Sequence, residues 1–309
     1  MLTITVIISK ILIFILLNVS LIFSSFFSLK PLLNNKMYLN RVDSVNLSSN
    51  SLIASNLYKI NEPETKSLRY AITESNNNLF LNEKNSFEIQ PIASITKLMT
   101  ALVVLDLKPN WEKIYEIERS DRREGGRIYL YLGDKVKIKD LFSLSLVGSA
   151  NTATAALVSS LNLSEEEFVK LMNNKAKDLG LTNTSFKDPV GLSVENLSNA
   201  REVALLAKSA LSKIEISETL KMDKIIFTTL QGQRREVDST DILLNEEFTS
   251  ELEFLGGKTG YIPEAGYCFV AKFKQQNRGE IIVSVLNSEN KLSRFHDALN
   301  LANYIYDIE

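Results

Sequence analysis

Ser94 and Lys97 stand three residues apart in a segment whose apolar residues recur at helical spacing. Positions i and i+3 of a helix share one face, so the lysine amine would lie beside the serine hydroxyl. A serine becomes a nucleophile when a neighbouring base takes its proton, and burial or a nearby cation lowers the pKa of a lysine toward the range of such a base. The pair suggests acyl transfer through a serine ester, although this spacing alone is common on helix surfaces.

A second pair of polar residues, Ser149 and Asn151, flanks Ala150 where two helical stretches meet. A hydroxyl can relay a proton, and a carboxamide can both donate to and accept from a substrate amide. The alternative is an ordinary interhelical turn or helix N-cap, which serine and asparagine often form. Taken alone, this motif predicts little.

The third group is Lys258, Thr259 and Gly260, preceded by two more glycines. The lysine offers a positive charge to a carboxylate, and the threonine offers a hydroxyl. We expect Gly260 to let a substrate backbone approach closely, because glycine has no side chain. On its own, the triplet would be an ordinary turn that contains a lysine.

In this order the motifs match the set S-x-x-K, S-x-N and K-T-G, which occurs in penicillin-binding proteins and class A β-lactamases. The chain resembles the low-molecular-mass penicillin-binding proteins that are D-alanyl-D-alanine carboxypeptidases. The likeness extends over PIASITKLMTAL, KIKDLFSLSLVGSANTATAAL, FKDPVGL and GGKTGYIPEAGYCFVA, and it runs from Leu68 to Tyr306. It implies a β-lactamase/transpeptidase-like fold.

In that family a serine is acylated by the penultimate D-Ala of a peptidoglycan stem peptide, the terminal D-Ala leaves, and water releases the acyl-enzyme. The resemblance implies that Ser94 is the nucleophile, Lys97 its general base and Ser149 a proton relay to the leaving amine. It also implies that β-lactams such as penicillin inhibit the enzyme by acylating the same serine, and that no metal or organic cofactor is needed.

The resemblance implies a substrate-binding set as well. Asn151 would hold the substrate amide, while Lys258 and Thr259 would hold the terminal carboxylate. The backbone N–H groups of Ser94 and Tyr261 would form an oxyanion hole, and one such donor is typically worth about 3 kcal/mol of barrier. The implied substrate-binding residues are Asn151, Lys258, Thr259, Gly260 and Tyr261.

Two positions depart from the family pattern. Thr152 stands where the family usually has an acid, which alters the local hydrogen bonding but not the nucleophile. The family segment Asn-x-Leu-Leu begins here with Asp241.

Two other functions could use parts of the same motif set. A class A β-lactamase needs a deacylating glutamate in an E-x-x-L-N motif, and no such motif lies between Asn151 and Lys258. A non-catalytic wall-binding or sensor protein of the same fold would not need Ser94, Lys97 and Ser149 together. Rapid turnover of a chromogenic cephalosporin would favour the β-lactamase. Failure to react with penicillin would favour the non-catalytic protein.

The elements that must position these residues follow from periodicity. A hairpin is predicted from strands at 69–73 and 79–81. Helices are predicted at 94–106, 136–146, 152–161, 165–179, 200–211 and 293–306, and strands at 225–230, 266–273 and 280–286. Strands at both ends with helices between them indicate an α+β fold, in which helices flank an antiparallel sheet and an all-helical lobe is inserted.

The remaining predictions concern the ends and the composition of the chain. Residues 11–27 contain no charge, so we expect residues 1–30 to be a signal peptide or an uncleaved N-terminal membrane anchor. Residues 31–54 form an Asn/Ser-rich spacer, and 55–309 the catalytic domain. The enzyme would then lie on the extracytoplasmic face of the cell membrane, or be secreted to the cell wall or periplasm.

The composition limits the kinds of molecule and metal that this protein is expected to bind. The net charge of −2 argues against a nucleic-acid-binding protein, which usually carries a basic excess. Cys268 is the only cysteine and His296 the only histidine, so an intramolecular disulfide is excluded and a His/Cys metal cluster is not expected. We interpret both residues as structural.

Overall fold

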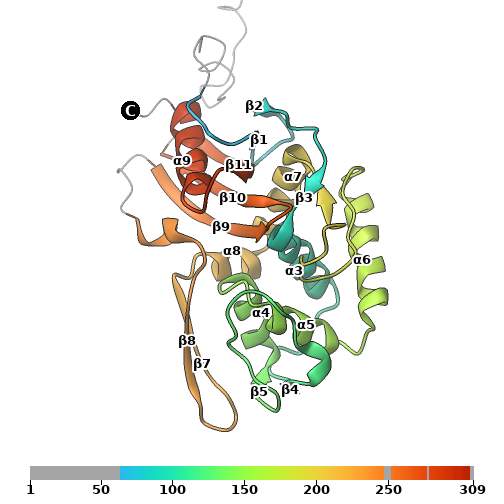
Figure 1. Ribbon diagram of the computed structural model, residues 1–309. Coiled ribbons are helices and arrows are strands. Elements are labelled where there is room, and N and C mark those ends of the chain that lie inside the picture. Colours follow the sequence, from blue (N-terminus) through green and yellow to red (C-terminus); the bar gives the residue numbers. More distant parts are fainter. Residues whose placement is uncertain (1–62, 247–251, 277, 307–309) are drawn as a thin grey trace, which may run out of the picture. The chain divides into compact units, whose positions relative to one another are not determined.

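Five antiparallel strands form the main sheet in the part of the chain that the computed structural model describes, residues 63–246, 252–276 and 278–306 (Figure 1). Their order is β2-β1-β11-β10-β9, so strands from the two ends of the domain pair with each other. This confirms the prediction of one sheet built from both ends. The bounds are β1 Arg69–Glu74, β2 Phe80–Lys84, β9 Leu252–Ile262, β10 Gly266–Gln275 and β11 Gly279–Ser288.

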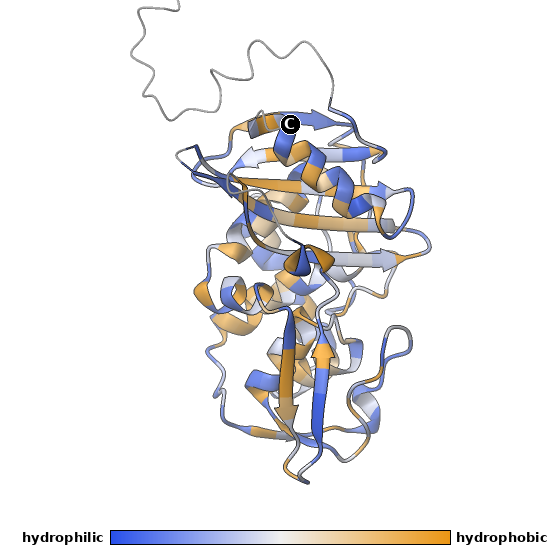
Figure 2. Ribbon diagram, turned by 90° about the vertical axis from the view of Figure 1, so that its left-hand side faces the viewer, coloured by the Kyte–Doolittle hydropathy of each residue, from blue (hydrophilic) through white to orange (hydrophobic). Residues whose placement is uncertain are grey.

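The sheet is covered on both faces, which explains why the apolar residues in the middle of β10 and β11 are buried on both sides of the strand. Along β11, Ile281 and Val283 belong to a core with helix α9 (Ser293–Tyr306), whereas Ile282 faces a larger core shared with the other helices. Figure 1 shows α9 on one face and α7 (Ala200–Leu211) and α3 (Thr96–Asp106) toward the other. In Figure 2, α9 alternates between hydrophilic and hydrophobic colour, as expected of a helix with one face against a sheet.

The helices between β2 and β9 complete the α+β architecture, with α4 and α5 in a lobe away from the sheet (Figure 1). One helix start is well explained by its sequence. Ser164 accepts from the backbone N–H of Glu167, whose side chain accepts from the N–H of Ser164, so a capping box fixes the start of the helix that follows. The helices not yet bounded are α4 Ile138–Leu146, α5 Asn151–Ser159, α6 Glu165–Asp178 and α8 Ile214–Leu220.

Short strands and turns connect these helices. The pairs are β3 with β6, β4 with β5, and β7 with β8. Their bounds are β3 Gln90–Pro91, β6 Leu197–Ser198, β4 Ile114–Glu116, β5 Lys135–Lys137, β7 Lys224–Thr228 and β8 Arg234–Asp238, and the 3₁₀ turns are η3 Ala93–Ile95, η4 Arg119–Asp121 and η5 Ile242–Asn245.

Two predicted helices begin later than expected. The helix expected at 136–146 starts at Ile138, because Lys135–Lys137 pair with Ile114–Glu116 as β5. Lys-Val-Lys alternates polar and apolar residues, which is the strand period. The helix expected from residue 94 starts at Thr96, after the η3 turn. Strand β8, with four charged residues in five, has too few apolar residues for periodicity to reveal it.

The predictions for residues 1–30 and 31–54 lie outside the described residues. Among the residues that are described, no helix is both long and apolar enough to cross a membrane. The anchor, the spacer and the catalytic-domain boundary at residue 55 stay predictions.

Candidate active site

Ser94 lies in the η3 turn at the start of α3 and is half-buried. The residue before it, Ala93, has a φ of 48°, a left-handed conformation that costs energy in a residue with a side chain. The loop at Gly191 packs closely against this turn. A Cβ on Gly191 would lie only 2.2 Å from the carbonyl oxygen of Ala93. The strained turn is therefore held by its neighbours, and it places Ser94 at the wall of a cavity.

Lys97 is fully buried behind Ser94. Its Nζ lies 2.9 Å from Ser94 Oγ, 3.0 Å from Asn151 Oδ1 and 2.6 Å from the carbonyl oxygen of Val190. Two of these oxygens carry no hydrogen, and the third belongs to a hydroxyl. A neutral amine fits this arrangement, because two N–H bonds reach the carbonyl oxygens and the lone pair is left for the hydroxyl of Ser94.

Burial lowers the pKa of Lys97 to about 7, and the nearby charge of Asp188 opposes that shift. A large fraction of the lysine is therefore neutral near pH 7. This is the state in which it could take a proton from Ser94.

A second serine–lysine pair lies across the cavity. Lys258, buried in β9, donates from Nζ to Ser149 Oγ at 2.9 Å and to the carbonyl oxygen of Thr259 at 3.0 Å. Burial holds the pKa of Lys258 well below its usual value, and the charges of Lys97 and Arg294 add to this shift. The protonated Lys258 is thus a stronger acid than an exposed lysine.

Asn151, at the start of α5, is hydrogen-bonded at both ends of its carboxamide. Its Oδ1 accepts from Lys97, and its Nδ2 donates to the carbonyl oxygen of Gly125 at 3.0 Å. Next to it, the hydroxyl of Thr152 accepts from the backbone N–H of Arg123 at 3.3 Å. The residue that replaces the family's acid therefore holds the loop beside the cavity and has no hydrogen bond to Ser94 or Ser149 among the described residues.

The close approach that Gly260 permits is to the protein's own backbone. A Cβ at this position would lie 2.8 Å from the carbonyl oxygen of Ile92 and 3.3 Å from the backbone nitrogen of Ile95. The glycine thus lets β9 run against the turn that carries Ser94, whereas the sequence suggested room for a substrate. Its neighbour Tyr261 is half-exposed and stacks on Tyr267, with ring centroids 4.3 Å apart.

The cavity between β9, α3 and the α4–α5 turn has a volume of about 510 Å³. Lys97 and Lys258 are not among its lining residues and lie behind it, each bonded to a serine that does line it. The structure therefore brings all eight predicted residues together, two of them in a buried second layer. The six at the wall are Ser94, Ser149, Asn151, Thr259, Gly260 and Tyr261.

Two further residues contribute that the motifs did not single out. Asp188 accepts hydrogen bonds from the backbone N–H groups of Val190 and Gly191, each at 2.6 Å, and so shapes the turn that delivers the Val190 carbonyl to Lys97. The Asp-Pro-x-Gly pattern of this turn was visible in the sequence. Arg294, buried in α9, donates to the carbonyl oxygen of Gly260 at 3.1 Å and lines the cavity, and no local pattern marks it.

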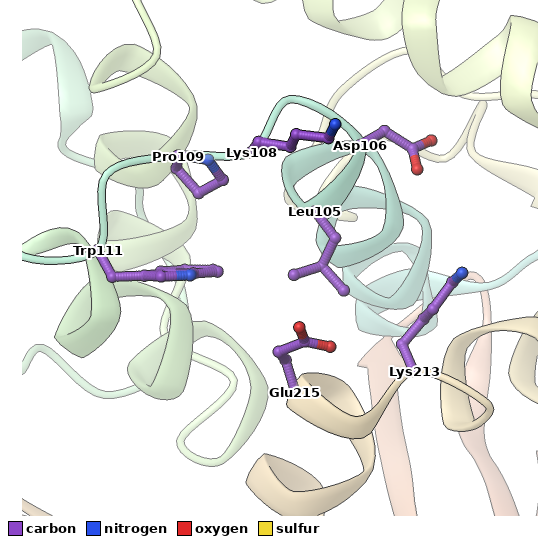
Figure 3. Close-up of a pocket in the computed structure, with 7 residues that line it drawn as sticks. All are labelled: Leu105, Asp106, Lys108, Pro109, Trp111, Lys213 and Glu215. Carbon is purple, nitrogen blue, oxygen red and sulfur yellow. The ribbon is translucent and has the colours of Figure 1, made fainter.

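A second cavity, of about 340 Å³, lies at the other end of α3 (Figure 3). The side chains of Trp111, Leu105 and Glu215 point into it, but none of its lining residues is a serine, threonine or cysteine. In the described ranges, no group of three or more histidine, cysteine or acidic residues is placed to hold a metal. The cavity at Ser94 is therefore the candidate active site.

A central antiparallel sheet, a helical lobe and a serine–lysine pair where the two meet define the penicillin-binding class of serine acyl-transfer proteins. A family model described as D-alanyl-D-alanine carboxypeptidase matches residues 57–290. The chain belongs to this family. It is a serine-type D-Ala-D-Ala peptidase whose substrate is peptidoglycan.

Curated relatives and a solved structure agree with this assignment. A D-alanyl-D-alanine endopeptidase of Escherichia coli K12 is 31% identical over 248 residues, which are 79% of this chain and 78% of the relative. A D-alanyl-D-alanine carboxypeptidase of Bacillus subtilis is 36% identical over 214 residues, 66% of this chain and 53% of the relative. Penicillin-binding protein D2 of Listeria monocytogenes, in a cefotaxime-bound form, superposes with a TM-score of 0.69 at 30% identity, covering 80% of this chain and 99% of that one.

Proposed function

We propose that Ser94 is the nucleophile of a carboxypeptidase that removes the terminal D-Ala from peptidoglycan stem peptides. The observation that carries this is the 2.9 Å contact between Ser94 Oγ and Lys97 Nζ, in a setting where burial lowers the pKa of the lysine to about 7. Lys97 takes the hydroxyl proton as the serine oxygen attacks the carbonyl carbon of the penultimate D-Ala.

The second pair handles the leaving group. As the C–N bond breaks, Ser149 gives its proton to the leaving amine and is reprotonated by Lys258, whose Nζ is 2.9 Å away. The lowered pKa of Lys258 favours this transfer. Water then attacks the ester: Lys97 returns to Ser94 the proton that it took, the proton released by the water passes through Ser149 to Lys258, and the shortened peptide leaves as a carboxylic acid.

Substrate binding is assigned to the cavity wall. The backbone N–H groups of Ser94 and Tyr261 would stabilise the developing oxyanion, and Asn151 would hold the substrate amide once it exchanges its bond to Gly125. Thr259, beside Gly260, would hold the terminal carboxylate, with the guanidinium of Arg294 supplying positive charge nearby. Because Lys258 lies behind Ser149 and not at the cavity wall, we expect it to act on the substrate through Ser149.

The same cavity would bind β-lactams, which would acylate Ser94. The Listeria relative, described in a cefotaxime-bound form, supports this proposal. No glutamate lines the described part of the cavity, where the one carboxylate is that of Asp238. This favours a long-lived acyl-enzyme over the rapid hydrolysis of a β-lactamase.

Location follows from the substrate. We place the catalytic domain outside the cell membrane or in the wall, with residues 1–30 as the signal or anchor. Fractionation of cells that express the full chain or a version lacking residues 1–30 tests this, since only the full chain should be recovered outside the cytoplasm.

Adduct mapping and peptide hydrolysis test the chemistry directly. Penicillin should add one acyl group at Ser94, located by mass spectrometry, and D-Ala should be released from diacetyl-Lys-D-Ala-D-Ala. The Ser94→Ala variant should lose both. An adduct on another residue, or D-Ala release by Ser94→Ala, would overturn the assignment, and rapid turnover of a chromogenic cephalosporin would replace it with a β-lactamase.

A further inference from the structure

A buried carboxyl group near the second serine–lysine pair takes no part in the chemistry described above. Asp241, the residue before the η5 turn, is only 2% exposed. Its Oδ1 accepts from the backbone N–H of Leu243 at 3.1 Å, whereas its Oδ2 is buried and has no hydrogen-bond partner among the described residues. A buried carboxylate oxygen without a partner is costly to the fold, and such groups are concentrated at functional sites.

The contacts on either side of Asp241 place it close to Lys258. The preceding residue, Thr240, has its Oγ1 2.6 Å from Oγ1 of Thr259, which directly follows Lys258 in β9. The following residue, Ile242, lines the active-site cavity, as Thr240 does, but Asp241 does not. Asp241 therefore lies behind the cavity wall, in the same buried layer as Lys258.

Cations from two elements face this carboxyl group. They are Lys258 in β9 and Arg294 in α9, and the charge of each favours the ionised form of Asp241. Arg294 Nε, like Asp241 Oδ2, is buried without a hydrogen-bond partner in the described part of the chain. Lys258 is itself close to the positive charges of Lys97 and Arg294, and the negative charge of Asp241 opposes their effect on it.

The acid at position 241 is not needed to form the turn. The segment that begins with Asp241 resembles the family's Asn-x-Leu-Leu, so asparagine is the usual residue at this position. Asparagine has nearly the same shape, and its carbonyl oxygen can accept from the N–H of Leu243 equally well. What the acid adds is a negative charge, and the cations that receive it are Lys258 and Arg294.

We propose that Asp241 is a positioning residue for proton delivery, whose negative charge keeps Lys258 protonated and ready to reprotonate Ser149. The proposal rests on the proposed function and adds one residue to it. No bond to Asp241 forms or breaks. The proton moves from Lys258 Nζ to Ser149 Oγ, 2.9 Å away, as Ser149 gives its own proton to the nitrogen of the leaving D-Ala.

This role depends on pH, because the carboxyl group has a charge only when it is ionised. Burial raises the pKa of Asp241 to about 7, and the charges of Lys258 and Arg294 oppose that shift. Below pH 7 the group is mostly protonated and resembles the neutral amide of asparagine. Above pH 7 it is mostly ionised, so it supports Lys258 but lowers the stability of the fold, since the raised pKa means that folding favours the protonated acid.

The test compares wild type and Asp241→Asn on two substrates with the same acyl group. One is diacetyl-Lys-D-Ala-D-Ala, and the other is the corresponding D-lactate ester, whose alkoxide leaves with less need of a proton. At pH 8 the substitution should lower kcat/KM for the peptide about tenfold, because loss of a nearby opposite charge makes Lys258 a weaker holder of its proton. The ester value should stay within about twofold of wild type.

Two further measurements separate this role from a structural one. At pH 6 the peptide values of wild type and Asp241→Asn should converge, because the wild-type carboxyl is then mostly protonated. At pH 8 the melting temperature of the variant should equal or exceed that of wild type, because a buried charge has been removed.

Glu246→Gln is the matched control. It also replaces an acid by its amide, at an exposed position that ends the same η5 turn and does not line the cavity. This variant should have the wild-type kcat/KM for both substrates at pH 6 and at pH 8.

An equal loss for peptide and ester in Asp241→Asn would overturn the inference, since the residue would then only support the fold. An unchanged peptide value at pH 8, or a loss of the same size at pH 6 and pH 8, would overturn it as well. These outcomes spare the proposed function. If wild type cleaves neither substrate and penicillin does not label Ser94, the proposed function itself fails, and the inference with it.

Discussion

The two serine–lysine pairs of the active site have the same geometry, but one joins residues close in the sequence and the other joins residues far apart. Ser94 and Lys97 are three residues apart on one helical segment, whereas Ser149 and Lys258 are 109 residues apart, on a turn of the lobe and a strand of the sheet. Each lysine is buried, and each Nζ is 2.9 Å from its serine.

Their surroundings make them different bases. Lys97 has the charge of Asp188 nearby, and burial lowers its pKa only to about 7. Burial holds the pKa of Lys258 well below its usual value; the charges of Lys97 and Arg294 add to this shift, and the nearby carboxyl of Asp241 opposes it. We expect the local pair to accept a proton and the long-range pair to deliver one, and the following predictions test that division.

The largest effect is expected for the local pair. Lys97→Met removes the base and should lower the rate of Ser94 acylation by penicillin about 10³-fold, within the range of general-base catalysis. Stopped-flow acylation measures this. Lys177→Met, at an exposed position on α6, is the control and should acylate at the wild-type rate. A similar loss in both variants would contradict the role of Lys97.

The long-range pair should matter less for attack and more for departure. Ser149→Ala removes the proton relay and should lower D-Ala release about 10²-fold, through kcat more than KM. Pre-steady-state measurement with an ester in place of the peptide sharpens the comparison, because an alkoxide leaves without needing the same proton. If ester and peptide hydrolysis fell equally, Ser149 would not be acting on the leaving amine.

Gly260 connects the two pairs, so its substitution should disturb both. In Gly260→Ala the new methyl group would lie 2.8 Å from the Ile92 carbonyl oxygen and push β9 away from the Ser94 turn. Overpacking of this kind costs about 1–3 kcal/mol. A lower melting temperature and roughly tenfold slower acylation are expected, by calorimetry and stopped flow. A variant with wild-type stability would show that β9 does not rest on the turn.

The smallest expected effect is a shift in pH dependence. Acylation needs neutral Lys97, so its rate should fall as pH drops below about 7, the pKa of the buried amine, and level off above it. Asp188 raises this pKa, so Asp188→Asn should move the midpoint of the profile to lower pH by less than one unit. Acylation measured from pH 5 to 9 tests both claims, and a midpoint that rises would refute the assignment of the base.

Much of the fold could be predicted from local pattern. The helix predicted at 200–211 follows from apolar spacing and is confirmed. Strand β8 and the late start of α4 could not be predicted in this way, since both depend on pairing partners elsewhere in the chain. The signal or anchor at residues 1–30 stays a prediction.

The sequence alone determined the local pair, because three-residue spacing on a helical segment places Lys97 beside Ser94. Only the tertiary structure decided what surrounds it. Lys97 contacts Asn151, which is 54 residues away in the sequence, and the carbonyl oxygen of Val190, which is 93 residues away. Lys258 contacts Ser149, which is 109 residues away. Contacts at such separations depend on how sheet and lobe pack, and that packing also buries the two lysines and thereby lowers their pKa values.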